Sequence, residues 1–253
     1  RRRSEQPATP PMVEVDGTDA LVVRGIDVAF GGFQALRDVS IDAGRHEVVG
    51  IIGPNGAGKT TLLNVITGMV PADSGTVVLG GVDLTGRPSF EIARHGLVRT
   101  FQNLRLFSAL TVRENIEVSA LVAQTSRERQ PPDVDALVAA AGLWEVRDRR
   151  ARELDYGTSR RLELARAAAM SPSFLLLDEP TSGMSDAEST SMIEQVRLMA
   201  GVIGAGVVVI DHDLNFITGI CDRIYCLDCG HVIAEGSPTE IQADPVVQAA
   251  YLG

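Results

Sequence analysis

The fold is decided by one stretch of sequence, Glu47-Val-Val-Gly-Ile-Ile-Gly53-Pro-Asn-Gly-Ala-Gly-Lys59-Thr60. Its first six residues predict a buried strand, and the residues from Lys59 to Gly68 predict a helix. The loop between them matches the pattern G-x-x-x-x-G-K-[ST], in the strand–loop–helix context that this pattern requires. A chance glycine turn is the alternative, but it explains neither the preceding strand nor the lysine and hydroxyl that close the pattern.

The glycine-rich loop has the chemistry of a phosphate-binding loop (P-loop). Glycines let the backbone curl so that successive N–H groups point inward, and the start of a helix adds a favourable potential for anions. Lys59 is expected to reach the β- and γ-phosphates of a nucleotide, and the Thr60 hydroxyl to ligate Mg²⁺. The predicted nucleotide-binding residues here are Gly53, Asn55, Gly56, Ala57, Gly58, Lys59, Thr60 and Thr61.

Two acids end a second apolar strand, predicted at Phe174–Asp178, more than a hundred residues downstream. The carboxyl ends of parallel strands meet at one edge of a sheet, where the P-loop also opens. Asp178 is therefore a predicted Mg²⁺ ligand, and Glu179 is expected to orient and polarise the attacking water. Alone, this pair of acids would indicate only a solvated loop. Because a P-loop precedes it, the pair instead predicts catalytic residues at the edge of the sheet.

Three further candidates each have an ordinary alternative. Gln102, where the core passes into a helical region, is predicted to ligate Mg²⁺ and touch the attacking water, or is a plain loop amide. His212 follows another apolar strand and is predicted to sense the γ-phosphate, or is a surface cation between two acids. Phe30 is predicted to stack on adenine, or is a core phenylalanine.

Around these motifs, strands alternate with helices, which predicts an α/β fold with a mainly parallel sheet covered on both faces. The alternating pattern from Leu21 to Ile41 predicts an antiparallel β unit with a turn at Gly31-Gly32. Helical patterns at Val112–Gln124 and Asp133–Arg150 predict a helical insertion at about residues 103–162. We expect residues 1–20 to be a flexible basic and proline-rich linker, and residues 21–253 to form the domain.

Composition narrows the possible partners. The net charge of −10 argues against a nucleic-acid partner, because binding to phosphate backbones favours a basic surface. No apolar run approaches the roughly 20 residues that span a bilayer. Cys226 and Cys229 have C-x-x-C spacing, but reduced cysteines beside a strand are favoured over a metal or redox site, and the cytosol is the expected compartment.

In this order, the motifs resemble those of ABC-transporter ATPases, over about residues 20 to 253. The resemblance implies a P-loop NTPase (RecA-like) core with an N-terminal antiparallel β subdomain and an inserted α-helical subdomain. Details resemble the ATPase subunits of bacterial branched-chain amino-acid importers, although urea importers share much of them. These details are Gly96–Gln102, Tyr156-Gly157, Arg160–Glu163, Gly183-Met184 and the ending Ala249-Ala-Tyr-Leu-Gly253.

The resemblance implies ATP and Mg²⁺ as cofactors, and a head-to-tail dimer in which each ATP lies between one P-loop and the partner's signature. It also implies that the chain is peripheral at the cytoplasmic face of the cell membrane and binds transmembrane permease subunits, either separate or fused upstream of Arg1. A substrate-binding protein would act indirectly. The alternative is a regulatory or non-transport ABC protein with weak hydrolysis.

One departure from the family pattern affects the signature, normally close to Leu-Ser-Gly-Gly-Gln. Here the segment that faces the partner's nucleotide is Asp155, Tyr156, Gly157 and Thr158, so Asp155 replaces a serine that donates a hydrogen bond to the γ-phosphate. An ionised aspartate only accepts. Asp155 also suits a helix N-cap. We therefore expect a heterodimer with a sister subunit that has an intact signature, rather than a homodimer.

Overall fold

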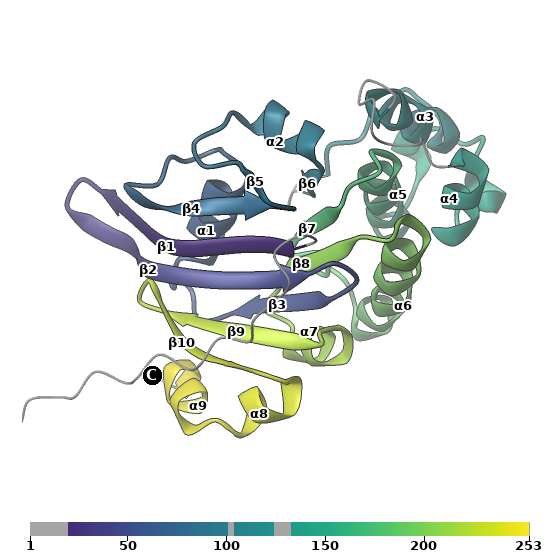
Figure 1. Cartoon of the computed structure of the whole chain (residues 1–253). Coiled ribbons are helices and arrows are strands. Elements are labelled where there is room, and N and C mark those ends of the chain that lie inside the picture. Colours follow the sequence, from purple (N-terminus) through teal and green to yellow (C-terminus); the bar gives the residue numbers. More distant parts are fainter. Residues whose placement is uncertain (1–19, 101–103, 124–132, 253) are drawn as a thin grey trace, which may run out of the picture.

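The computed structural model describes residues 20–100, 104–123 and 133–252, which form two sheets with helices packed around them (Figure 1). The first sheet is antiparallel, in the order β2-β1-β4-β5. Its strands are β1 (Ala20–Phe30), β2 (Phe33–Gly44), β4 (Ser74–Leu79) and β5 (Val82–Asp83). It corresponds to the predicted antiparallel unit, and β1 and β2 turn at Gly31-Gly32, both with positive φ.

The second sheet has the order β10-β9-β3-β8-β7-β6. Neighbouring strands from β9 through β6 are parallel, and β10 pairs antiparallel with β9. Its strands are β3 (Val48–Ile52), β6 (Leu97–Arg99), β7 (Phe174–Asp178), β8 (Gly206–Ile210), β9 (Arg223–Asp228) and β10 (His231–Gly236). The predicted α/β class with a mainly parallel sheet is confirmed. Because β3, β7 and β8 are adjacent and parallel, the chain segments that follow them lie at one edge.

The helices are α1 (Lys59–Ile66), α2 (Ser89–His95), α3 (Val112–Ala123), α4 (Val134–Ala140), α5 (Tyr156–Ala169), α6 (Asp186–Ile203), α7 (Leu214–Ile220), α8 (Pro238–Ala243) and α9 (Pro245–Leu252). Figure 1 shows α3, α4 and α5 together at one end of the molecule. The predicted helix at Asp133–Arg150 is wrong beyond Ala140. Gly142 has a φ of 63°, which ends the helix, and two 3₁₀ turns follow at Trp144–Val146 and Ala151–Glu153.

Two apolar cores lie on opposite faces of the six-stranded sheet. Side chains alternate along β8, so Val207 and Val209 join the core shared with α3, α5 and α6, while Val208 and Ile210 join the core shared with α1 and the antiparallel sheet. Burial on both faces explains why this strand is a continuous apolar run rather than an alternating one. In the part of the chain that the structure describes, no helix has the length and apolar character needed to cross a bilayer.

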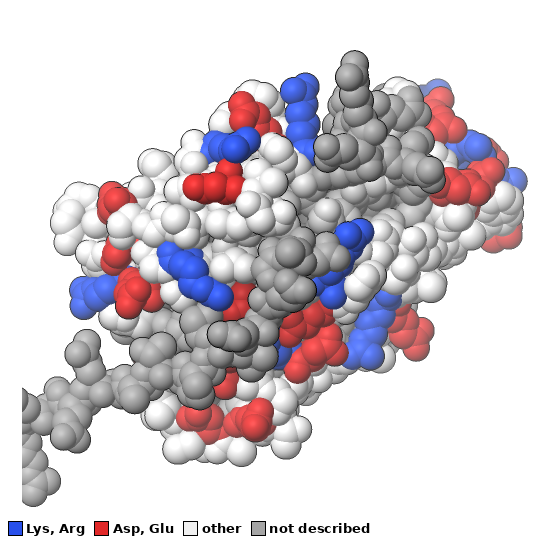
Figure 2. All heavy atoms as spheres, viewed as in Figure 1, with Lys and Arg blue, Asp and Glu red and all other residues white. Residues whose placement is uncertain are grey.

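Figure 2 shows acidic and basic side chains interspersed over one face of the molecule. Several of the acids cap helices. Glu188 accepts hydrogen bonds from the Ser185 N–H and hydroxyl at the start of α6, and Glu240 accepts the same pair from Ser237 at the start of α8. The backbone N–H, and then the hydroxyl, lower the pKa of each glutamate below its usual value of 4.5.

These capping carboxylates predict how stability depends on pH. A pKa that is lower in the folded chain means that the cap stabilises fully above the unfolded value and is lost as pH falls through the folded value. We expect the free energy of unfolding in urea to hold down to about pH 5 and then to fall as the pH drops below the ordinary glutamate pKa of about 4.5. The Glu240→Gln variant should show a shallower fall. Equal stability at pH 5 and pH 3 would contradict this assignment.

Candidate nucleotide-binding site

The P-loop is pressed between β3, β9 and β2, and this close packing explains two of its glycines. A Cβ atom on Gly53 would overlap the carbonyl oxygen of Leu227, and one on Gly58 would lie 2.8 Å from the carbonyl oxygen of Ala35. Both glycines also have positive φ, at 146° and 104°. A side chain at either position would therefore displace the loop from its supporting strands.

Lys59 lies at the first position of α1 and folds back over the loop. Its Nζ donates to the carbonyl oxygens of Gly53 and Pro54, at 2.7 and 2.9 Å. Partial burial lowers the pKa of Lys59, and the negative charge of Glu179 opposes that shift. Among the described residues, no side chain caps the start of α1. The first N–H groups of this helix are therefore available to an anion, as a phosphate site requires.

Asp178 and Glu179 stand at the end of β7, beside the P-loop. The Asp178 carboxylate is held by Arg99 of the neighbouring strand β6, with 2.6 Å between Nη2 and Oδ2, and both side chains are nearly buried. Glu179 has a φ of 48°, and its N–H donates to the carbonyl oxygen of Ile210 at 2.8 Å. A non-glycine residue in this conformation stores strain, which here turns the chain sharply at the strand end.

His212 lies in the loop after β8 and exposes 69% of its side chain. The buried carboxylate of Asp211 organises this loop. Its Oδ1 accepts from the N–H groups of His212 and Asp213, and its Oδ2 accepts from the N–H and hydroxyl of Thr181. Asp211 thus fastens the histidine loop to the segment that follows Glu179. No role was predicted for Asp211, and its one signal in the sequence is that of an acid at the end of an apolar strand.

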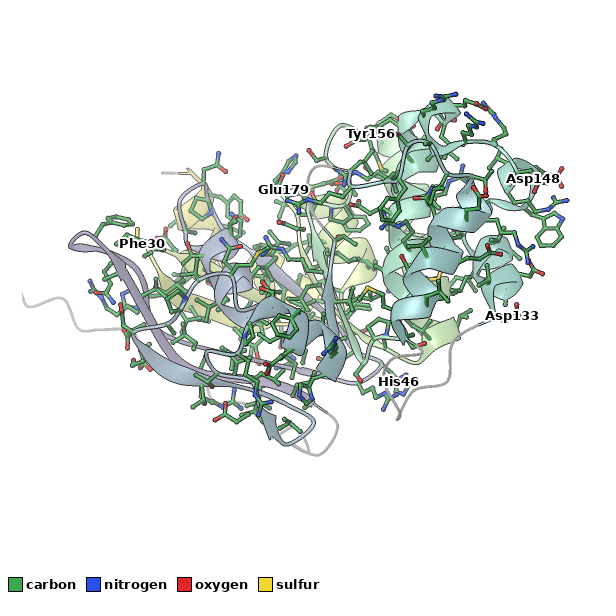
Figure 3. All side chains as sticks on the ribbon, turned by 90° about the horizontal axis from the view of Figure 1, so that it is seen from above. Phe30, His46, Asp133, Asp148, Tyr156 and Glu179 are labelled. Atoms are coloured by element: carbon green, nitrogen blue, oxygen red, sulfur yellow. The ribbon has the colours of Figure 1, made fainter. Side chains whose placement is uncertain are left out.

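Phe30 ends β1 and is half exposed, so the alternative of a core phenylalanine is excluded. Phe33 lies on the other side of the same turn and is 67% exposed, although no function was predicted for it. Figure 3 shows Glu179 between Phe30 on the hairpin and Tyr156 at the start of α5. An aromatic ring exposed on this side of the P-loop is available to a flat ligand such as a nucleobase.

Asp155 is the N-cap of α5, which confirms the capping interpretation. Its Oδ1 accepts from the N–H of Thr158 at 2.7 Å, and its Oδ2 accepts from the Thr158 hydroxyl at 3.0 Å. These bonds, the backbone one first, lower the pKa of the exposed carboxyl group, which is ionised at neutral pH. Tyr156 donates to the carbonyl oxygen of Ser182 at 2.7 Å, so α5 is joined to the segment after Glu179.

Comparison with known proteins identifies this arrangement. Residues 36–182, more than half of the chain, match the profile of a family described as ABC transporter. The chain belongs to the ABC transporter family. Residues 231–253 also match a profile described as branched-chain amino acid ATP-binding cassette transporter.

The similarity to named relatives in the ABC transporter family extends over nearly the whole chain. The LivG protein of Salmonella typhimurium, a high-affinity branched-chain amino acid transport ATP-binding protein, is 38% identical, with 92% of this chain and 97% of the relative covered. The Escherichia coli K12 protein of the same name is 39% identical with the same coverage. BraF of Pseudomonas aeruginosa is 36% identical, over 92% of this chain and 97% of its own length.

Solved ABC cassettes share the fold. A crystal structure of the ADP conformation of an ATP-binding cassette superimposes with a TM-score of 0.79 at 31% identity, covering 92% of this chain and 98% of the other. A nucleotide-free ATP-binding cassette gives 0.78 at 30% identity with the same coverage. The chain is thus an ATP-binding transport ATPase with the fold that the sequence predicts.

The structure describes some of the remaining predicted residues and not others. Gln102 lies outside the described residues. Cys226 is buried in β9 and Cys229 is exposed in the turn after it, and both are free thiols. Within the described ranges, no three His, Cys, Asp or Glu side chains gather as a ready-made metal site. Thr60 and Asp178 suit Mg²⁺, which takes only one or two protein oxygens and completes its shell with phosphate and water.

Proposed function

We propose that this chain is the ATPase subunit of an importer for branched-chain amino acids or a related small polar solute. The match of residues 231–253 to the branched-chain amino acid cassette profile carries this proposal, together with relatives that are named for that transport. The chain would bind permease subunits at the cytoplasmic face of the membrane, and a substrate-binding protein would deliver the solute to them.

Uptake tests the choice of solute. Proteoliposomes that contain this chain, its sister ATPase and its permeases should accumulate labelled leucine when MgATP is enclosed with the chain and the binding protein is supplied outside. Labelled urea under the same conditions is the control, since it distinguishes the related importers. Accumulation of urea without leucine would contradict the proposed solute while leaving the ATPase assignment intact.

The proposed roles combine the sequence motifs with the geometry of the described residues. The P-loop amides and the Lys59 ammonium bind the phosphates of ATP, and Phe30 stacks on adenine. Thr60, Asp178 and Gln102 would hold Mg²⁺, which supplies positive charge next to the β- and γ-phosphates. Glu179 positions the attacking water and draws its proton, and His212 contacts the γ-phosphate across the edge.

The signature supports a sister subunit as the dimer partner. In a head-to-tail dimer, Asp155 would face the partner's γ-phosphate with an ionised carboxylate that has no proton to donate. Like charges about 4 Å apart, at an effective dielectric near 20, repel by up to roughly 4 kcal/mol per pair. Glu188 adds a second acid here, because its Oε1 would lie 3.1 Å from a Cβ on Gly157. Two such signatures in a homodimer would weaken both sites.

The Asp155→Ser variant tests this arrangement in the isolated chain. The expected ATPase rate of the native chain is negligible, and the serine variant should raise it at least about tenfold, with a rate that depends on enzyme concentration. Serine retains the helix cap and restores the donor. Asp155→Asn is the companion variant, since asparagine also caps the helix but replaces the carboxylate by a neutral amide that can donate.

Three outcomes separate the possibilities. Activation by both substitutions would assign the defect to the ionised carboxylate, because asparagine removes its charge and also offers a donor. Activation by serine alone would assign the defect to the missing hydroxyl. Ready turnover by the native chain, unchanged in Asp155→Ser, would mean that Asp155 is only a cap and that a homodimer is the better description.

A further inference from the structure

The C-terminal sequence Ala249-Ala-Tyr-Leu-Gly253 has no part in the site described so far, although one of its residues contacts the P-loop. Tyr251 lies in the last turn of α9, and its hydroxyl oxygen accepts a hydrogen bond from the N–H of Gly53 at 2.8 Å. The two residues are 198 positions apart in the sequence. The final helix of the described chain therefore touches the first residue of the phosphate-binding loop.

Gly53 is the point at which the loop leaves β3, and its backbone is held from two sides. Its N–H is bound by Tyr251, and its carbonyl oxygen accepts from Lys59 Nζ at 2.7 Å. Without a side chain, the two torsions of a glycine are soft, so its flanking peptide planes depend on their hydrogen bonds. Pro54 follows and has no N–H, so Gly53 supplies the last amide donor before Asn55.

Among the described residues, this bond is the principal polar link between α9 and the loop. A cavity of about 280 Å³ is lined by Ile52, Ile224, Ile241, Val247 and Tyr251, among others. Burial raises the pKa of Tyr251, so its neutral hydroxyl accepts the hydrogen bond at physiological pH.

We propose that Tyr251 is a positioning residue that fixes the Gly53 peptide and thereby sets the P-loop for nucleotide binding. It acts through the loop and does not touch the nucleotide itself. The inference rests on the proposed nucleotide binding by the P-loop, and it assigns a role to α9 within the segment 231–253 that matches the branched-chain amino acid cassette profile.

The Tyr251→Phe variant removes the acceptor and keeps the ring that bounds the cavity. With the full chain, calorimetric titration with MgADP should show a dissociation constant about three- to tenfold higher than that of the native chain, as expected for one lost neutral hydrogen bond. Hydrogen exchange at the Gly53 amide should accelerate, while the melting temperature stays close to the native value. In the assembled transporter, KM for MgATP should rise with kcat retained.

Val246→Ala is the matched control, because Val246 is half exposed on the same helix. It should leave both the MgADP affinity and the exchange of Gly53 unchanged. Failure of the native chain to bind MgADP would refute nucleotide binding by the P-loop instead. Equal affinity in the native and Tyr251→Phe chains would overturn the role of Tyr251, as would equal weakening by Val246→Ala.

Discussion

The Glu179→Gln variant of the assembled transporter is expected to hydrolyse ATP about 10²- to 10⁴-fold more slowly than the native protein, while still binding MgATP. Glutamine keeps the size of the side chain and its hydrogen-bonding oxygen, but it cannot take a proton from water at neutral pH. Glu179 directly follows the end of β7, and its charge acts on Lys59. Phosphate release at saturating MgATP measures the rate.

Two accompanying measurements give this result its meaning. Equilibrium binding of MgATP should be within a few-fold of native, since the P-loop is untouched. Glu91→Gln, an equivalent change on the exposed part of α2, should leave the rate unchanged. A Glu179→Gln rate within about threefold of native would remove Glu179 from the proposed mechanism and assign water activation to another group.

The second large effect concerns stability and is expected from Arg223→Met. The Arg223 guanidinium binds three carboxylates from separate parts of the chain, Asp42, Glu47 and Glu235, at 2.9, 2.9 and 2.6 Å. It also donates to the Tyr225 hydroxyl at 2.7 Å. Because the Asp42 side chain is fully buried, methionine would leave it with much of its charge uncompensated.

Removal of one partner from a buried ion pair costs about 3–5 kcal/mol, and we expect a loss of that size in the free energy of unfolding. Urea denaturation followed by circular dichroism measures it. The control is Arg24→Met, since Arg24 also pairs with Asp42, at 3.4 Å, but exposes 40% of its side chain. It should cost no more than about 1 kcal/mol. Equal losses in the two variants would show that the buried ion pairs of Arg223 contribute no more to the free energy of unfolding than the exposed pair of Arg24.

Local patterns allowed part of this molecule to be predicted, because the P-loop and its flanking strand and helix occupy one short stretch. The acids after Phe174–Leu177 were found in the same way, since strand, edge and carboxylate are consecutive in sequence. Contacts between segments that are distant in sequence leave no local pattern from which to predict them. The pairing of β6 with β7, which brings Arg99 to Asp178, depends on the order of strands in the sheet. The bond from Gly53 to Tyr251 also joins segments that are 198 positions apart.

Backbone conformation at single residues was also not predictable from the sequence. Nothing in the residue type predicts a φ of 48° at Glu179, because glutamate favours other conformations and the surrounding strands impose this one. The shortened helix at Val134–Ala140 is a simpler case, in which Gly142 ends the helix despite an apolar pattern that continues past it. The proposed roles of His212, Phe30 and Gln102 stay predictions.

The position of β3 in its sheet has a consequence for the synthesis of this protein. Both neighbours of β3 come from the last fifth of the chain, β8 on one side and β9 on the other. At about 5–20 residues per second, the roughly 180 residues between Ile52 and the end of β9 take a ribosome about 10–35 s to add. Until β8 has been added the Val48–Ile52 segment has neither strand partner, and until the end of β9 it lacks the second. A nascent chain arrested before Gly206 should therefore be a good client for chaperones that bind short apolar segments, and one released beyond Asp228 a poor one.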